Sequence, residues 1–212
     1  MAYDLEEQES IDQMKAWWEK WGTPITAAVC VVCLGFAAWN GWNWYQRNMA
    51  AEAAGAYVQL QNAVYQDDVK NVESISNGLM EEYGSTVYAP MAALTSAAAQ
   101  AKAGNLAGAE KRLRWVIDES RFTEYNTVAR IRLAGLLLNE GKLDEAMQML
   151  DAAQPTDLQI AMLEDRRGDI FFAKKDYAQA RTAWEKALKA GTTGTTISAV
   201  VTMKIGALPV AE

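Results

Sequence analysis

The sequence predicts an all-α protein in which a single N-terminal transmembrane helix is followed by a tetratricopeptide-like α-solenoid of helical hairpins. Three observations predict this fold. An uncharged run near the N-terminus is long enough to cross a bilayer. The remaining chain is rich in Ala, Leu, Glu, Lys and Gln and has no alternating Val/Ile/Thr runs bounded by turn pairs. Similar segments recur in it at intervals of about 34 to 37 residues, near the tetratricopeptide period of ~34.

Composition excludes several classes of function. The 212 residues include 20 Lys and Arg against 27 Asp and Glu, so the net charge of −7 argues against a nucleic-acid partner. Histidine, the commonest general base and zinc ligand, is absent from the sequence. The two cysteines, Cys30 and Cys33, lie in the middle of the apolar run and are interpreted as packing residues. We therefore expect no metal site and no cofactor.

The uncharged run covers residues 21–46, between Lys20 and Arg47, and it is the predicted membrane anchor. Aromatic residues cluster on both sides of its apolar centre, as amphipathic rings do at the two headgroup zones of a bilayer. The predicted membrane anchor belt consists of Trp17, Trp18, Trp21, Trp39, Trp42, Trp44 and Tyr45. A buried core helix and a cleavable signal peptide are the alternatives, and the long, acidic leading segment disfavours the signal peptide.

The charges on the two sides of this run predict the topology. Two lysines and the terminal amine precede it, whereas only Arg47 follows it closely. Because cationic residues favour the cytoplasmic side, we expect residues 1–20 to be cytoplasmic, residues 21–46 to span the membrane and residues 47–212 to form a repeat domain outside the cytoplasm. The cytoplasmic segment fits either a helix on the membrane surface or a docking tail for a partner.

Three similar segments are centred on turns at Gly104, Gly141 and Lys175. In each, a small residue precedes the turn, a bulky residue follows it, a small residue comes three positions later, and a large residue comes four positions after that. Small residues let two antiparallel helices approach, and large residues fill the groove between them. The predicted repeat-packing residues are Ala97, Leu106, Ala109, Leu113, Ala134, Leu143, Ala146, Leu150, Gly168, Tyr177, Ala180 and Trp184.

Further helices complete the predicted stack. A divergent helix pair is expected at residues 48–66 and 68–83, and residues 157–174 and 176–190 form the pair around the third turn. Apolar residues between 197 and 205 are expected to form a helix that caps the last repeat, because a stack of repeats exposes an apolar edge.

Tetratricopeptide stacks leave a concave surface that usually binds segments of other proteins. Spacing along the first helices of two hairpins predicts a candidate groove of Ile131, Gly135, Leu138, Asp165, Asp169 and Phe172. For each apolar member of this set, core packing is the favoured interpretation. The carboxylates of Glu164, Asp165 and Asp169 are expected on solvated helix faces, interleaved with Lys and Arg. No phosphate-binding loop and no GxSxG motif occur in the sequence, and we predict no catalytic residue and no enzyme.

The layout as a whole resembles a known family. Its most specific parts are DQMKAWWEKWG at 12–22, joined to the apolar anchor, and LEDRRGDIFFAKKDYAQARTAWE at 163–185. These parts resemble the YfgM-like ancillary SecYEG translocon subunit family. The tail after Gly191 and the unusually Trp-rich exit from the anchor depart from the family pattern. The resemblance implies a single-pass protein of the bacterial inner membrane, with a cytoplasmic N-terminus and a periplasmic repeat domain.

The resemblance also implies partners: the SecYEG translocon, a periplasmic PpiD-like chaperone and the membrane lipid. The implied role is that of a membrane-anchored adaptor that links protein export to periplasmic chaperones. A tetratricopeptide scaffold for envelope or cell-division protein assembly is the alternative. Both roles use the same architecture, so the fold alone does not separate them.

Overall fold

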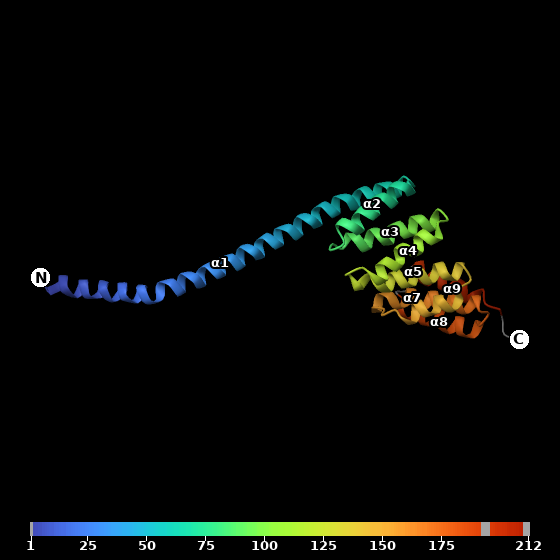
Figure 1. Cartoon of the computed structure of the whole chain (residues 1–212). Coiled ribbons are helices and arrows are strands. Elements are labelled where there is room, and N and C mark those ends of the chain that lie inside the picture. The colour runs from blue at the N-terminus through green and yellow to red at the C-terminus, as the bar shows by residue number, and fades with distance from the viewer. Residues whose placement is uncertain (1, 192–195, 210–212) are drawn as a thin grey trace. The chain divides into compact units, whose positions relative to one another are not determined.

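The computed structural model describes residues 2–191 and 196–209, and all regular elements in these ranges are helices (Figure 1). The predicted all-α fold class is therefore confirmed. The chain divides into two compact units, Met1–Ala51 and Glu52–Glu212. The helices are α1 (Ala2–Tyr65), α2 (Val69–Glu82), α3 (Tyr88–Lys102), α4 (Leu106–Asp118), the 3₁₀ helix η1 (Thr123–Tyr125), α5 (Asn126–Asn139), α6 (Leu143–Asp151), α7 (Asp157–Ala173), α8 (Tyr177–Ala190) and α9 (Thr196–Gly206).

The first unit consists of the N-terminal part of α1. Where the sequence suggests a short leading helix, a span and a separate first repeat helix, the structure has one continuous helix, Ala2–Tyr65. Pro24 lies inside it, and a proline removes one backbone donor from the helical ladder. Close by, the Thr26 hydroxyl donates to the Gly22 carbonyl at 2.7 Å.

The apolar side chains of this unit point outward on all sides. Val31, Val32, Leu34 and Phe36 are each about 70% exposed. Residues Gln8–Tyr65 include a stretch that is long and apolar enough to cross a membrane, judged by length and composition. Because a soluble core helix would bury these side chains, their exposure fits a helix whose surroundings are lipid.

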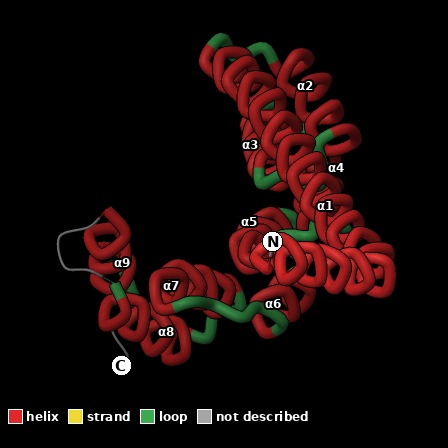
Figure 2. The backbone as a smooth tube through the Cα atoms, turned by 90° about the vertical axis from the view of Figure 1, so that its left-hand side faces the viewer, coloured by secondary structure: helices red, strands yellow, loops and turns green. Residues whose placement is uncertain are grey.

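The second unit is a stack of helical hairpins joined by short loops (Figure 2). The turns of four successive hairpins each place one residue at positive φ: Asp67 at 54°, Gly104 at 83°, Gly141 at 76° and Lys175 at 63°. These turns lie 37, 37 and 34 residues apart. Within the described residues, the sequence pattern therefore marks three of the four turns, and the divergent first hairpin follows the same geometry.

Each turn ends its first helix with the same backbone bond. The residue after the positive-φ residue donates its backbone N–H to the carbonyl of the residue five positions before its own. Examples are Asn105 to Gln100 at 2.9 Å and Asp176 to Phe171 at 3.0 Å. Such bonds satisfy carbonyls left open at a helix C-terminus. Asp68, Asn105 and Asp176 then cap the next helix through their side chains, whereas Lys142 at the third turn makes no such bond.

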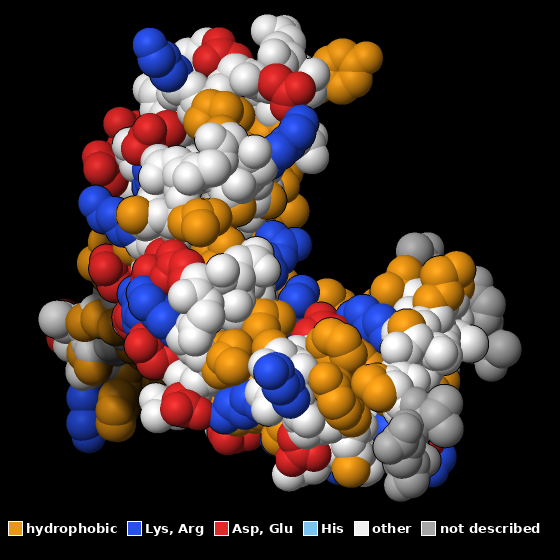
Figure 3. Space-filling view, turned by 90° about the vertical axis from the view of Figure 1, so that its right-hand side faces the viewer, with side chains coloured by type: hydrophobic (Ala, Val, Ile, Leu, Met, Phe, Trp, Pro, Cys, Tyr) orange, Lys and Arg blue, Asp and Glu red, His pale blue; other side chains and the backbone are white. Residues whose placement is uncertain are grey.

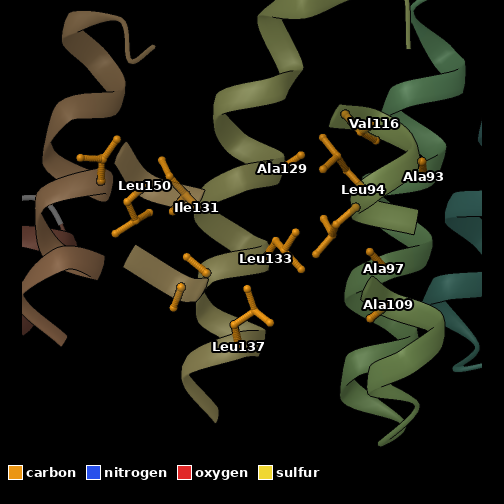
Figure 4. Close-up of a cluster of buried hydrophobic side chains, with 14 of the residues drawn as sticks. Ala93, Leu94, Ala97, Ala109, Val116, Ala129, Ile131, Leu133, Leu137 and Leu150 are labelled. Carbon is orange, nitrogen blue, oxygen red and sulfur yellow. The ribbon is translucent and has the colours of Figure 1, made fainter. Parts of the chain in front are cut away.

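The core runs along the stack in three clusters. The largest lies between α3 and α7 and includes Leu94, Leu133 and Leu150, drawn in Figure 4. The helix expected at residues 197–205 is present as α9, and Val201 is fully buried in a cluster with Trp184 and Ala187 of α8. Met203 is 73% exposed, so only one side of α9 covers the end of the stack.

Candidate functional site

The aromatic residues of the predicted membrane anchor belt all lie on α1, and each is between 48% and 66% exposed. Their rings project from the helix, where they are free to contact lipid headgroups. The Lys20 Nζ lies 6.0 Å from the centre of the Trp21 ring. This arrangement gives the chain two groups of amphipathic side chains on either side of an apolar stretch.

The repeat-packing positions separate into two groups. The small residues Ala97, Ala109, Ala134, Ala146, Gly168 and Ala180 are all buried, and so are the large residues Leu113, Leu150 and Trp184. The bulky residues directly after each turn differ: Leu106 and Leu143 are half-buried, and Tyr177 is 37% exposed. Tyr177 packs instead against Phe172, with ring centres 5.6 Å apart.

In the last hairpin, Gly168 of α7 packs directly against the large indole of Trp184 on α8. A methyl group at Gly168 would overlap the indole of Trp184. The same indole donates its Nε1–H to the Asp165 carbonyl at 3.2 Å. Glycine at this position therefore makes room for a tryptophan where the other hairpins have an alanine and a leucine.

The hollowed side of the repeat unit carries Lys and Arg side chains along it (Figure 3). Two adjoining cavities lie on the first helices of successive hairpins. The first, about 530 Å³, is mainly apolar and lies against α3, with Val64, Val72 and Ala98 in its lining. The second, about 340 Å³, is bordered by α3, α5 and α7. Ala98 and Arg132 line both cavities, so the two lie next to each other, and together they are called the concave groove.

Arg132 lies where the two cavities meet. Its guanidinium donates to the Leu94 carbonyl at 3.1 Å, and within the described part of the chain no carboxylate forms an ion pair with it. Partial desolvation lowers the pKa of Arg132, and the nearby Tyr57 opposes this effect. Arg112 provides a contrast: burial lowers its pKa as well, but Glu73 lies 3.6 Å from its guanidinium.

Arg166 brings a second guanidinium into the smaller cavity. It donates to Asp169 at 3.2 Å, while its buried Nε has no partner among the described residues. Gly135 faces it from α5: a methyl group at Gly135 would lie 3.2 Å from the guanidinium carbon. The missing side chain at Gly135 therefore leaves room for the Arg166 head on the floor of the groove.

The acidic residues of α7 are more enclosed than expected. Lys204 of α9 donates to both Asp165 and Asp169 at 2.6 Å, and only 21% and 18% of these side chains are exposed. Burial raises the pKa of Asp169, although the hydrogen bond from Lys204 opposes that effect. Glu164 is 15% exposed and lies 3.6 Å from Arg167. The expectation of solvated carboxylates is wrong here, because α9 and neighbouring cations cover them.

The six residues of the predicted candidate groove do not form one surface. Ile131 is 4% exposed and packs in the main core, so its placement in a groove is corrected to core packing. Leu138 packs against the same core. Gly135 alone of the six lines the concave groove described above. Phe172 is 45% exposed, and its ring lies 5.9 Å from that of Trp184.

Reasoning from the sequence missed Arg132, Arg166 and Ala98 as groove residues. One signal for Arg132 was present: it is a single cation inside the apolar run IRLAGLLL of a buried helix. The Arg132 side chain is exposed, so this run directs its one cation out of the core and into the lining of both cavities. Among the described residues, no cluster of three potential metal ligands occurs. The groove itself combines apolar space with two guanidinium groups.

Comparison with known proteins agrees with the helical-hairpin architecture of the repeat unit. The sequence profile described as tetratricopeptide repeat-like domain matches residues 15–210. Proteins named ancillary SecYEG translocon subunit are similar over nearly their whole length. The one from Haemophilus influenzae is 28% identical over 191 residues, covering 90% of this chain and 93% of that protein. The one from Neisseria gonorrhoeae is 28% identical, covering 89% and 90%. The one from Escherichia coli is 24% identical, covering 96% and 97%. No solved structure matches this chain.

Proposed function

The chain belongs to the tetratricopeptide repeat-like family that includes these ancillary SecYEG translocon subunits, and from this premise we propose that it is a membrane-anchored adaptor of the SecYEG translocon. In this role the repeat unit links protein export to periplasmic chaperones of the PpiD-like kind. The chain needs no catalytic residue for such a function, because it acts by holding partners near one another.

One observation supports the proposal above all others: an exposed apolar helix is joined to a hairpin stack that carries an open groove. An anchor raises the local concentration of the repeat unit at a membrane-embedded partner, so even weak contacts are effective. The groove supplies a surface for a partner segment, as concave faces of repeat proteins do.

The proposal includes a topology. Residues 1–20 are assigned to the cytoplasm, residues 21–46 to the inner membrane and residues 47–212 to the periplasm, on the charge difference between the two sides of the anchor. A reporter fused after Glu212 should be active only outside the cytoplasm. Activity of the fusion in the cytoplasm would reverse the assignment.

The decisive experiment is copurification. We would solubilise membranes with a mild detergent, capture the full chain through a tag after residue 212, and identify the bound proteins by mass spectrometry. SecY, SecE and SecG together with a periplasmic chaperone are the expected partners. Envelope-assembly or cell-division proteins in their place would support the alternative scaffold role, and binding of neither set would overturn both.

A further inference from the structure

We propose that the concave groove binds a partner segment that carries a carboxylate side chain next to an apolar side chain. This inference rests on the proposed adaptor function and names the chemistry of the segment that the repeat unit recognises. The carboxylate occupies the smaller cavity, between Arg132 and Arg166, and the apolar side chain occupies the larger cavity beside Ala98.

The charges in the smaller cavity are the first step of the argument. Two guanidinium groups line it, and Arg132 has no carboxylate partner within the described ranges. The Arg132 side chain is exposed and is held by the Leu94 carbonyl, so its charge is accessible to an incoming anion. Arginine presents several N–H donors in a planar fork that suits a carboxylate in particular. The net charge of the whole chain is −7, so this cationic patch runs against the overall charge.

The apolar lining of the larger cavity is the second step. Valines from α1 and α2 face alanines of α3 across about 530 Å³, a volume sufficient for a large apolar side chain. The cavity is open because α3 presents Ala98 and Ala99 there, followed by Ala103 just after the helix, where longer side chains would fill it. Lys102 and Asp67 pair with each other at its rim at 2.6 Å, so this end offers little net charge.

The connection between the cavities is the third step. Arg132 and Ala98 belong to both linings, so the apolar and cationic parts lie side by side along α3. A single short segment can therefore fill both at once. Lys204 pairs with Asp165 and Asp169 of α7, and Arg166 also pairs with Asp169 at 3.2 Å. Among the described residues, Arg132 is therefore the arginine of the groove that has no ion pair.

The test is site-specific photo-cross-linking in membranes that contain the full chain. Benzoylphenylalanine replaces Asn139, an exposed residue that lines the smaller cavity, and in a matched control it replaces Ala178, an exposed residue of α8. We expect at least five-fold more adduct from position 139. Mass spectrometry of the adduct should map a partner segment with Asp or Glu within a few residues of Leu, Ile, Val, Met or Phe.

Two substitutions in the cross-linking background probe the two parts of the groove. Arg132→Gln removes the unpaired cation, and Ala98→Leu fills the groove from an exposed position where the core is untouched. Each should lower the adduct yield at least three-fold, whereas Arg181→Gln, on the exposed surface of α8, should leave it unchanged. If the Arg132→Gln variant does not fold, the adduct yield of Ala98→Leu alone tests whether the groove binds the segment.

Other outcomes overturn the inference. These are equal adducts from both positions, no adduct, or an adduct with lipid, with a second copy of the chain or with a segment that lacks acidic residues. If translocon subunits still copurify in any of these cases, the adaptor function stands and only the proposed chemistry of the groove fails. If the groove adduct forms but translocon subunits do not copurify, the adaptor function fails instead.

Discussion

The two units of this chain use apolar side chains in opposite ways. In the first unit, Val31, Val32 and Leu34 are about 70% exposed on a single helix. In the second unit, Leu113, Leu133 and Leu150 are at most 2% exposed in a packed stack. Both units are helical, so the difference in exposure of their apolar side chains reflects a difference in surroundings, lipid for the first unit and water for the second. A surface that would aggregate in water is the correct surface in a bilayer.

Placing a charged residue on an exposed position of each unit is the most direct test of this difference in surroundings. Leu34→Arg in the anchor should weaken membrane insertion by about 3 kcal/mol, because a cation at the centre of a bilayer is costly. Leu158→Arg, at a leucine of α7 that is 90% exposed, should change stability by at most about 0.5 kcal/mol. Alkaline carbonate extraction of membranes followed by immunoblotting measures the first effect.

Urea unfolding of the full chain in nanodiscs measures the second effect. If the Leu34→Arg chain remains in the membrane pellet as fully as the Leu158→Arg chain, exposure of the first unit does not reflect contact with lipid. Both are leucines with exposed side chains, 69% for Leu34 and 90% for Leu158, so the main difference between them is what surrounds each helix.

The second prediction uses two glycines. Gly168→Ala should destabilise the last hairpin by about 1–3 kcal/mol, because the added methyl group overlaps the Trp184 indole. Gly35→Ala in the anchor has nothing within 4 Å of the added methyl group and should leave the repeat unit unchanged. Hydrogen–deuterium exchange mass spectrometry of α7 and α8 reports the loss of protection. Equal protection in both variants would contradict the close packing of this hairpin.

Local signals in the sequence predict most of the fold, but they do not predict which side chains line the groove. The uncharged run, the turn at Gly104 and the small-to-large spacing up to Trp184 depend on neighbours within a few turns of helix, and periodicity reveals them. The contacts of Lys204 with Asp165 and Asp169 join residues 39 and 35 positions apart, which no local pattern encodes. Local spacing likewise leaves Ile131 open to the groove or the core, and the structure buries it in the core.

The hairpin turns of the repeat unit allow a further comparison, between a lysine and two glycines at equivalent positions. Lys175 takes a positive φ of 63° at a turn where Gly104 and Gly141 take 83° and 76°. Because a side chain is strained in this region and glycine is not, Lys175→Gly should raise the free energy of unfolding by about 0.5–1 kcal/mol. Gly104→Lys, the reverse exchange at an equivalent turn, should lower it by about 1 kcal/mol. Urea denaturation measures both, and a change of the same sign in both would contradict the shared turn geometry.

The smallest expected effects are two pH dependences of opposite sign, each measured as the stability of the native chain relative to an asparagine variant. Burial raises the pKa of Asp169 above its usual value, so its folded state binds a proton more readily. Its contribution to stability is therefore greatest below the unfolded pKa and is lost as the pH rises through the folded pKa. The exposed Asp144 has a lowered pKa because Lys174 bonds to it, at 2.6 Å.

The contribution of Asp144 is thus present above the unfolded pKa and is lost as the pH falls through the folded pKa. Urea midpoints of Asp169→Asn and Asp144→Asn, compared with the native chain between about pH 3 and pH 7, should diverge in opposite directions. Asp169 is enclosed by Lys204, Arg166 and Asp165, whereas Asp144 meets one lysine in water. Parallel shifts in the two variants would mean that burial beneath α9 does not govern the ionisation of Asp169, and that the end of the stack is open to solvent.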